Sequence, residues 1–215
     1  MQRLIRGPRT GLVLTISGLA LVVVGVLVIL FPVLGLLQRS GADQHALREW
    51  RDPGAALTHR LPKVKIDTAL GSGPGASQVC GGGSSSAEYA LIDFPSLSGI
   101  EGVAGDGTWA LLTQRSVVHY ASSPGPGQAG NGIYAVHREP NFEPLGTLSA
   151  GDLITVTNRQ CQKFTYRITN LWTENPAQVT QLQPLSSGSW ITVITCTPLW
   201  VDSQRLVIRA ELESP

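Results

Sequence analysis

One feature constrains this sequence more than any other: an uncharged apolar run at residues 11–37, GLVLTISGLALVVVGVLVILFPVLGLL. About 20 apolar residues are enough to cross the hydrocarbon core of a bilayer. A segment in lipid must also satisfy its own backbone hydrogen bonds, which favours a helix. The alternative, a cleaved signal peptide, has a shorter apolar core of about 7–15 residues and a small-residue cleavage site. The run therefore predicts one uncleaved transmembrane helix, with a kink or the membrane exit at Pro32.

The charges around the run predict its orientation. Residues 1–10 carry Arg3, Arg6 and Arg9 and no acidic residue, whereas basic and acidic side chains are mixed after the run. Long C-terminal domains cross the membrane largely regardless of their own charge. We therefore expect a single-pass protein of the cell membrane, with a cytoplasmic tail over residues 1–10 and an extracytoplasmic C-terminal domain.

The composition changes twice after the apolar run. Residues 38–86 are polar and are predicted to form an extracytoplasmic linker, with ALREW as a candidate short helix that Asp52-Pro53-Gly54 would stop. Their end, GSGPGASQVCGGGSSS, is typical of a flexible extracytoplasmic linker, or alternatively of a long surface loop. From residue 87 onward, short runs rich in Val, Ile, Thr, Tyr and Trp alternate with turn sequences. That pattern predicts an all-β barrel or sandwich over residues 87–215.

Charge and metal-binding motifs narrow the function further. The formal net charge is +1, without the clustered basic face that nucleic-acid binding needs. The sequence contains no Cys-x-x-Cys, no His-x-x-x-His and no dense carboxylate loop. We therefore expect no nucleic-acid partner, no metal site and no cofactor.

Three residues at the ends of β runs carry reactive chemistry. Cys196 ends WITVITC, His137 ends GIYAVH, and Arg205 begins RLVIRAEL. Each has an ordinary alternative: a small buried thiol, a surface histidine and an exposed strand-edge arginine. The short segment between Cys196 and Arg205 would permit their side chains to meet at one rim of a β-domain.

The ordered set of segments over residues 90–212 resembles the sortase family of cysteine transpeptidases. The resemblance is carried by PGQAGN at 126–131, VHR at 136–138, LSAGDLITV, KFTYRIT and ITVITCTPLWVDSQRLVIRAEL. The Thr-Cys-Thr-Pro stretch and the single N-terminal anchor are most similar to the actinobacterial class E-like sortases. Two positions depart from the family pattern, Val136 in place of glycine and Val193 in place of leucine.

The resemblance implies a fold and a set of roles. The fold is a closed sortase-type β-barrel of about eight strands with short helical turns. Cys196 is the nucleophile, His137 its base and acid partner, and Arg205 the stabiliser of the oxyanion. A thiolate is the reactive form of cysteine, and an imidazolium beside it favours that form. A fixed guanidinium suits the charge that develops on a carbonyl oxygen under attack.

The resemblance also implies substrates. The enzyme would cleave the Thr–Gly bond of an LPxTG- or LAxTG-like signal at the C-terminus of secreted proteins and hold the product as a thioacyl-enzyme. An amine, from a peptidoglycan precursor or a pilin lysine, would then receive the acyl group. The alternatives are a cysteine peptidase that hydrolyses the same bond and a non-catalytic anchored β-domain that binds a cell-surface partner.

Five further residues have weaker assignments. Thr195 is a candidate for orienting the substrate or the thiol, and the alternative is a plain strand residue. His119 is predicted to be structural or to support the site from beside the cleft, and it is the chief competitor of His137 for the role of base. Arg209 is the main rival of Arg205. Cys80 and Cys161 could form a disulfide outside the cell, and Cys196 would then be the free thiol.

Overall fold

The computed structural model describes residues 8–52, 80–81, 87–185 and 187–213, which belong to two compact units. The first unit, Met1–Gln38, holds most of helix α1 (Pro8–Arg51). The second unit, Arg39–Pro215, holds the last turns of α1 and the β-domain.

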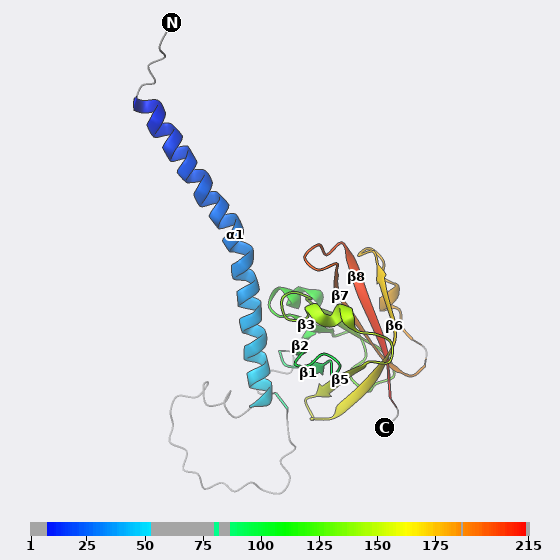
Figure 1. Cartoon of the computed structure of the whole chain (residues 1–215). Helices are drawn as coiled ribbons and strands as arrows, with labels where there is room; N and C mark the ends of the chain where they lie inside the picture. The colour runs from blue at the N-terminus through cyan, green and yellow to red at the C-terminus, as the bar shows by residue number, and fades with distance from the viewer. Residues whose placement is uncertain (1–7, 53–79, 82–86, 186, 214–215) are drawn as a thin grey trace, which may run out of the picture. The chain divides into compact units, whose positions relative to one another are not determined.

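Helix α1 contains the whole apolar run predicted to span a membrane, with Pro32 inside it. It is long and apolar enough to cross a bilayer, and its described large apolar side chains from Ile16 to Leu34, together with Leu37, are exposed. Figure 1 shows one unbroken helix that ends at Arg51. The sequence instead predicts a separate short helix at ALREW, stopped by Asp52-Pro53-Gly54, and the structure joins this segment to the apolar helix. The helix thus extends into the predicted linker, residues 38–86. The rest of that linker lies outside the described residues, apart from residues 52, 80 and 81.

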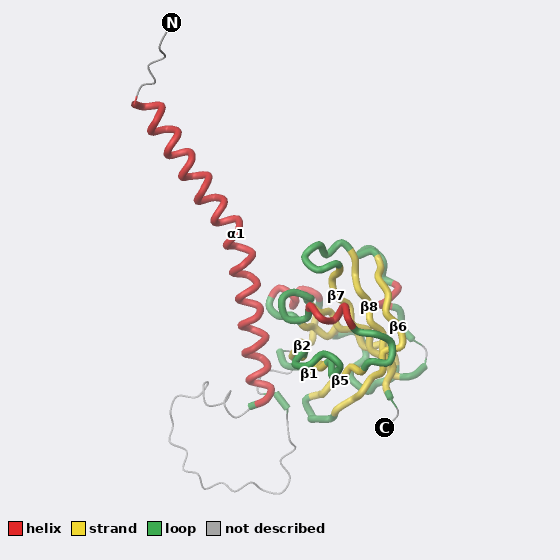
Figure 2. Tube along the Cα trace, in the orientation of Figure 1, coloured by secondary structure: helices red, strands yellow, loops and turns green. Residues whose placement is uncertain are grey.

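In the described part of the chain, eight strands close one barrel in the order β1-β2-β3-β4-β7-β8-β6-β5, which confirms the predicted all-β barrel. The strands are β1 (Ala90–Asp93), β2 (Glu101–Gly107), β3 (Val117–Tyr120), β4 (Gly130–Val136), β5 (Leu153–Asn158), β6 (Lys163–Glu174), β7 (Ser189–Thr197) and β8 (Gln204–Leu212). The described helical turns of the β-domain are the 3-10 helices η1 (Trp109–Thr113), η2 (Glu143–Thr147) and η3 (Thr180–Leu182). Figure 2 shows these turns as short red segments beside the yellow strands.

The barrel interior is filled by aliphatic and aromatic side chains that alternate along the strands. Ile92, Tyr134, Ile154, Tyr166 and Ile208 are fully buried in one continuous cluster. Burial of each such side chain contributes roughly 1.5–3 kcal/mol. A core of this kind holds the strand ends in fixed positions relative to one another.

Two strand pairings bring distant parts of the chain to one edge of the barrel. Strands β4 and β7 are parallel, with Val136 opposite Thr195, so both strands end at the same edge. Strands β7 and β8 are antiparallel, with Cys196 opposite Arg205. The residue after β4, the end of β7 and the start of β8 therefore meet at this edge.

A disulfide joins Cys80 to Cys161 and answers the question that the sequence left open. Cys161 lies in the turn between β5 and β6, and the Cys80 amide donates to the carbonyl of Arg159 (2.9 Å). Cys196 is the free cysteine.

Candidate active site

A cavity of about 410 Å³ opens at the edge where β4, β7 and β8 meet. Its walls contain a thiol, an imidazole and a guanidinium, from Cys196, His137 and Arg205. The remaining lining residues are mostly apolar: Trp109, Leu112, Ala135, Val136, Pro176, Gln178, Val179, Gln181, Leu182, Ile194 and Thr195. The structure thus brings together the three residues that the sequence predicts as catalytic.

Cys196 is half-buried near the end of β7, one residue before the turn that Thr197-Pro198 begins. Burial raises the pKa of the Cys196 thiol, because a thiolate loses solvation there. The positive charge of Arg205 opposes this shift, and the negative charge of Asp202 adds to it. The resting sulfur is therefore mainly a protonated thiol at neutral pH.

His137 directly follows β4 and is held by two carbonyl groups. Its backbone N–H donates to the carbonyl of Ser116 (2.8 Å), and its Nε2 lies 2.8 Å from the carbonyl oxygen of Leu112 in η1. A carbonyl can only accept, so Nε2 carries a proton and Nδ1 holds the lone pair of the neutral ring. Burial lowers the pKa of His137, although the bond to Leu112 opposes the shift. Nδ1 is therefore the ring nitrogen able to take up a proton.

Arg205 is fixed at the rim of the cavity by the backbone of its own turn. Its Nη1 donates to the carbonyl groups of Asp202 (3.1 Å) and Gln204 (3.0 Å). A guanidinium keeps its charge at all ordinary pH values and presents several donors in one plane. The side chain can therefore direct positive charge and N–H groups toward an oxygen bound near Cys196.

The rival arginine lies elsewhere on β8. Arg209 packs over the ring of Trp172, with 5.1 Å between the guanidinium carbon and the ring centroid. It donates to Thr192 Oγ1 (3.3 Å) and to the carbonyl of Gln181 (3.2 Å). Unlike Arg205, it is not among the residues that line the cavity.

Of the two auxiliary residues predicted from the sequence, Thr195 lines the cavity. Its side chain is buried, and Oγ1 has no hydrogen-bond partner among the residues that the structure describes. His119 is buried outside the cavity lining, with Nδ1 2.8 Å from Asp106 and Nε2 3.1 Å from the carbonyl of Pro124. Its ring also stacks on Tyr89. These contacts suit a structural role for His119.

Sequence reasoning missed two charged residues that follow His137. Buried Arg138 donates through Nη1 to Thr197 Oγ1 (2.9 Å) and to the carbonyl of Cys196 (3.4 Å). Glu139 accepts a hydrogen bond from the backbone N–H of Trp200 (2.9 Å). The available signal was the adjacency of two charges to a candidate base, but their partners could not be read from the sequence.

The arrangement supports nucleophilic chemistry on a carbonyl compound. Proton transfer from the thiol to Nδ1 would create a thiolate and an imidazolium, which titrate as one pair. The mainly apolar walls limit solvation and strengthen the interaction of Arg205 with a developing negative charge. Among the described residues, no group of three or more His, Cys, Asp or Glu is arranged to hold a metal ion.

Comparison with known proteins identifies the family. A sequence model described as "Sortase domain" matches residues 92–213, and the chain therefore belongs to the sortase family. Sortase SrtE1 of Streptomyces coelicolor is 28% identical over 137 residues, which agrees with the class E-like resemblance of the sequence. That alignment covers 56% of this chain, and the chain spans only 39% of the length of the relative.

Solved structures show the same fold. The sortase D5 transpeptidase of Clostridium perfringens has a TM-score of 0.56 and 19% identity, with 82% of this chain and 98% of that chain covered. Sortase C1 of Streptococcus agalactiae has a TM-score of 0.52 and 26% identity, with 60% of this chain and 69% of that chain covered. These likenesses confirm the predicted sortase-type barrel.

Proposed function

We propose that this chain is a membrane-anchored cysteine transpeptidase that cuts a C-terminal sorting signal and transfers the product to an amine. The observation that carries the proposal is the convergence of Cys196, His137 and Arg205 on one cavity. Membership of the sortase family supports the same reaction class.

The first half-reaction forms a thioester. His137 Nδ1 takes the proton of the Cys196 thiol, and the sulfur attacks the carbonyl carbon of the threonine in a Thr–Gly bond. Arg205 stabilises the negative charge that develops on the carbonyl oxygen. The C–N bond then breaks, and Nδ1 returns its proton to the departing glycine amine. Throughout, the N–H at Nε2 continues to donate a hydrogen bond to the carbonyl of Leu112.

The second half-reaction releases the product. An amine attacks the thioester carbon, and His137 accepts the proton that the amine loses. The carbon–sulfur bond breaks, the new amide leaves, and the proton returns to Cys196. The mainly apolar walls of the cavity suit the leucine and the proline or alanine of an LPxTG- or LAxTG-like signal.

The proposed location follows from the sequence around α1. The helix is the candidate anchor, and the basic residues before it favour a cytoplasmic N-terminus. The catalytic domain would then lie outside the cell membrane, with secreted proteins and cell-wall precursors or pilin subunits. An oxidised Cys80–Cys161 pair suits that compartment.

Mass spectrometry of the full chain in detergent tests the proposal. Incubation with LPxTG and LAxTG peptides should produce an acyl adduct on Cys196 and release the glycine-containing fragment. An added amine should discharge the adduct as an amide. The adduct should be absent from the Cys196→Ala variant and abundant in Arg209→Ala, whose guanidinium lies outside the cavity lining.

Three outcomes would contradict the proposal in different ways. Release of only the free acid in the presence of amines would identify a hydrolytic peptidase. No adduct with any peptide of the panel would remove the catalytic interpretation. A Cys196→Ala chain that supports every cell-surface phenotype would indicate a non-catalytic β-domain.

A further inference from the structure

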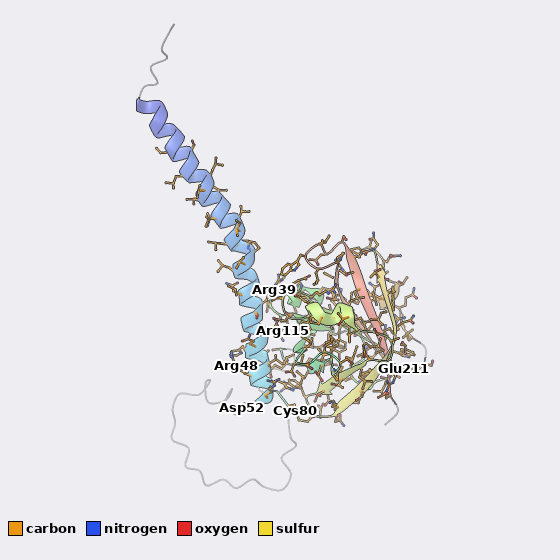
Figure 3. All side chains as sticks on the ribbon, viewed as in Figure 1. Arg39, Arg48, Asp52, Cys80, Arg115 and Glu211 are labelled. Carbon is orange, nitrogen blue, oxygen red and sulfur yellow. A yellow bond between two sulfur atoms is a disulfide. The ribbon has the colours of Figure 1, made fainter. Side chains whose placement is uncertain are left out.

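The last turns of α1, residues 39–51, belong to the same compact unit as the barrel, and we call them the docked segment. Figure 3 labels Arg39 and Arg48 on this segment, with Arg115 of the barrel beside it. Such docking would be expected to stabilise the domain. In addition, the hydrogen bonds of Asp43 connect the segment to residues that hold His137, the candidate base.

Asp43 is the residue of the docked segment with the densest polar contacts to the barrel. Its Oδ1 accepts the backbone N–H of Ser116 (3.0 Å), and its Oδ2 accepts hydrogen bonds from the Ser116 hydroxyl and from Asn141 Nδ2 (2.7 Å). Ser116 is completely buried. Hydrogen bonds to a carboxylate are about twice as strong as those between neutral groups.

The two partners of Asp43 are each connected to the backbone of His137. Ser116 holds His137 directly, because its carbonyl accepts the His137 backbone N–H (2.8 Å). Asn141 lies in the turn that follows His137 in the chain. One carboxylate therefore fixes both the residue that holds the backbone of His137 and the turn into which that backbone continues.

The charge of Asp43 also reaches the imidazole. After the main effect of burial, which lowers the pKa of His137, charged groups of two elements act on the ring. From the docked segment, Arg39 lowers the pKa and Asp43 raises it; from the β7–β8 turn, Asp202 raises it. Cys196 and Arg205 face the same cavity as the ring.

We propose that Asp43 is a positioning residue for His137, so that the segment following the membrane anchor is a working part of the catalytic unit. The inference rests on the proposed function, because it assumes that His137 transfers the proton. Asp43 does not touch the substrate or the sulfur in this scheme. It acts through Ser116 and Asn141, and its loss leaves the imidazole less well aligned with the thiol.

The docked segment has other attachments that do not involve Asp43. Trp50 is buried against Gly81, whose backbone N–H donates to the Trp50 carbonyl (3.3 Å). Gly81 has φ +81°, and a Cβ there would lie 2.8 Å from the Trp50 ring, so only glycine fits. Arg51 forms an ion pair with Glu101. A substitution at Asp43 should therefore leave the segment attached.

The test compares Asp43→Asn and Asp43→Ala with Arg51→Gln in the full chain in detergent. Arg51→Gln removes a contact of the same segment without affecting Ser116 or Asn141, and it is the matched control. Misalignment of a reacting group can lower a rate by up to about 100-fold. We expect kcat for peptide cleavage to fall at least 10-fold in both Asp43 variants, with KM changed less than about 2-fold. The control should retain its kcat.

Titration of the His137 imidazole by NMR provides a readout that a loss of stability alone would not produce. Removal of the negative charge should move the midpoint to lower pH in Asp43→Asn, whereas Arg51→Gln should leave it in place. If Asp43→Ala fails to fold, Asp43→Asn decides the question, since it keeps the size of the side chain.

The inference is overturned if Asp43→Asn matches the control in both kcat and imidazole titration. Failure of the proposed function has a different signature, namely no acyl adduct in the unmodified chain. The NMR comparison remains informative in that case, because it follows the ring and does not need turnover. An unshifted midpoint would then exclude the positioning role as well.

Discussion

At the scale of single residues, burial opposes ionisation of both reacting groups. It raises the pKa of Cys196 and lowers that of His137, so the neutral thiol and neutral imidazole are favoured at rest. Arg205 is the charge that most offsets this tendency at the sulfur. The reactive thiolate–imidazolium pair is therefore a minor form at neutral pH, which suits a selective acyl transferase better than a fast protease.

This balance predicts the pH dependence of alkylation at Cys196. The rate with iodoacetamide should rise with pH, with a midpoint above the usual thiol range, because the folded environment disfavours the thiolate. Arg205→Ala should move the midpoint higher still, since it removes the positive charge that favours the anion. Cys80 and Cys161 are joined in a disulfide, so mass spectrometry of the intact chain reports Cys196.

Arg209→Ala is the matched control for that experiment. Its guanidinium comes from the same strand but contacts Trp172 and lies outside the cavity lining. Its midpoint should coincide with that of the unmodified chain. An Arg205→Ala profile that overlaps the control would show that Arg205 does not act on the sulfur.

At the scale of elements, the turn after β4 holds the turn between β7 and β8. Arg138 bonds Thr197 and the carbonyl of Cys196, and Glu139 bonds the N–H of Trp200. Trp200 has φ +63° in this turn, a backbone conformation that is unfavourable for residues other than glycine. The buried charges after His137 therefore offset local strain and fix the ends of the strands that carry Cys196 and Arg205.

Loss of the Arg138 side chain should affect both stability and rate. Arg138→Met leaves Thr197 without this partner, and we expect the free energy of unfolding to fall by about 1–3 kcal/mol. The rate of acyl-enzyme formation should fall by at least about 10-fold, because the turn no longer fixes Arg205 opposite Cys196. Urea unfolding measures the change in stability, and mass spectrometry of samples quenched at successive times measures the rate of acyl-enzyme formation.

The surface pair Arg167–Glu213 offers a control of the same chemical type. Arg167→Met removes an exposed guanidinium and should change the unfolding free energy by less than about 1 kcal/mol. It should not change the rate of acylation. Equal effects of the two substitutions would argue against any special role of the turn after β4.

The element scale also shows what the sequence can and cannot predict. Runs such as GIYAVH and WITVITC signal strands by their β-branched and aromatic composition and the turn sequences that bound them, and their ends mark His137 and Cys196. The continuation of α1 as a segment docked on the barrel was not predicted. Its contacts join Asp43 to Ser116 and Asn141, which lie 73 and 98 residues away in the sequence. No local pattern encodes such pairs.

At the scale of the whole chain, the disulfide and the docked segment form one connected attachment. Cys80 is tied to Cys161 in the β5–β6 turn, and the next residue, Gly81, contacts Trp50 near the end of α1. The disulfide thus secures the backbone against which the end of the docked segment packs. Cleavage of this bond should loosen the Trp50 end of the segment, whereas Asp43 holds the segment at another point.

A chain with both Cys80→Ser and Cys161→Ser tests this connection. The bond closes a loop with a sequence separation of 81, for which the loss of unfolding free energy should be about 4 kcal/mol. Because Gly81 would no longer be fixed, amide hydrogen exchange should also rise around Trp50, and it should rise less around Asp43. Urea unfolding and hydrogen-exchange mass spectrometry measure these effects, with Arg51→Gln as the control for a weakened helix end alone. Equal protection at Trp50 with and without the disulfide would show that the two attachments are independent.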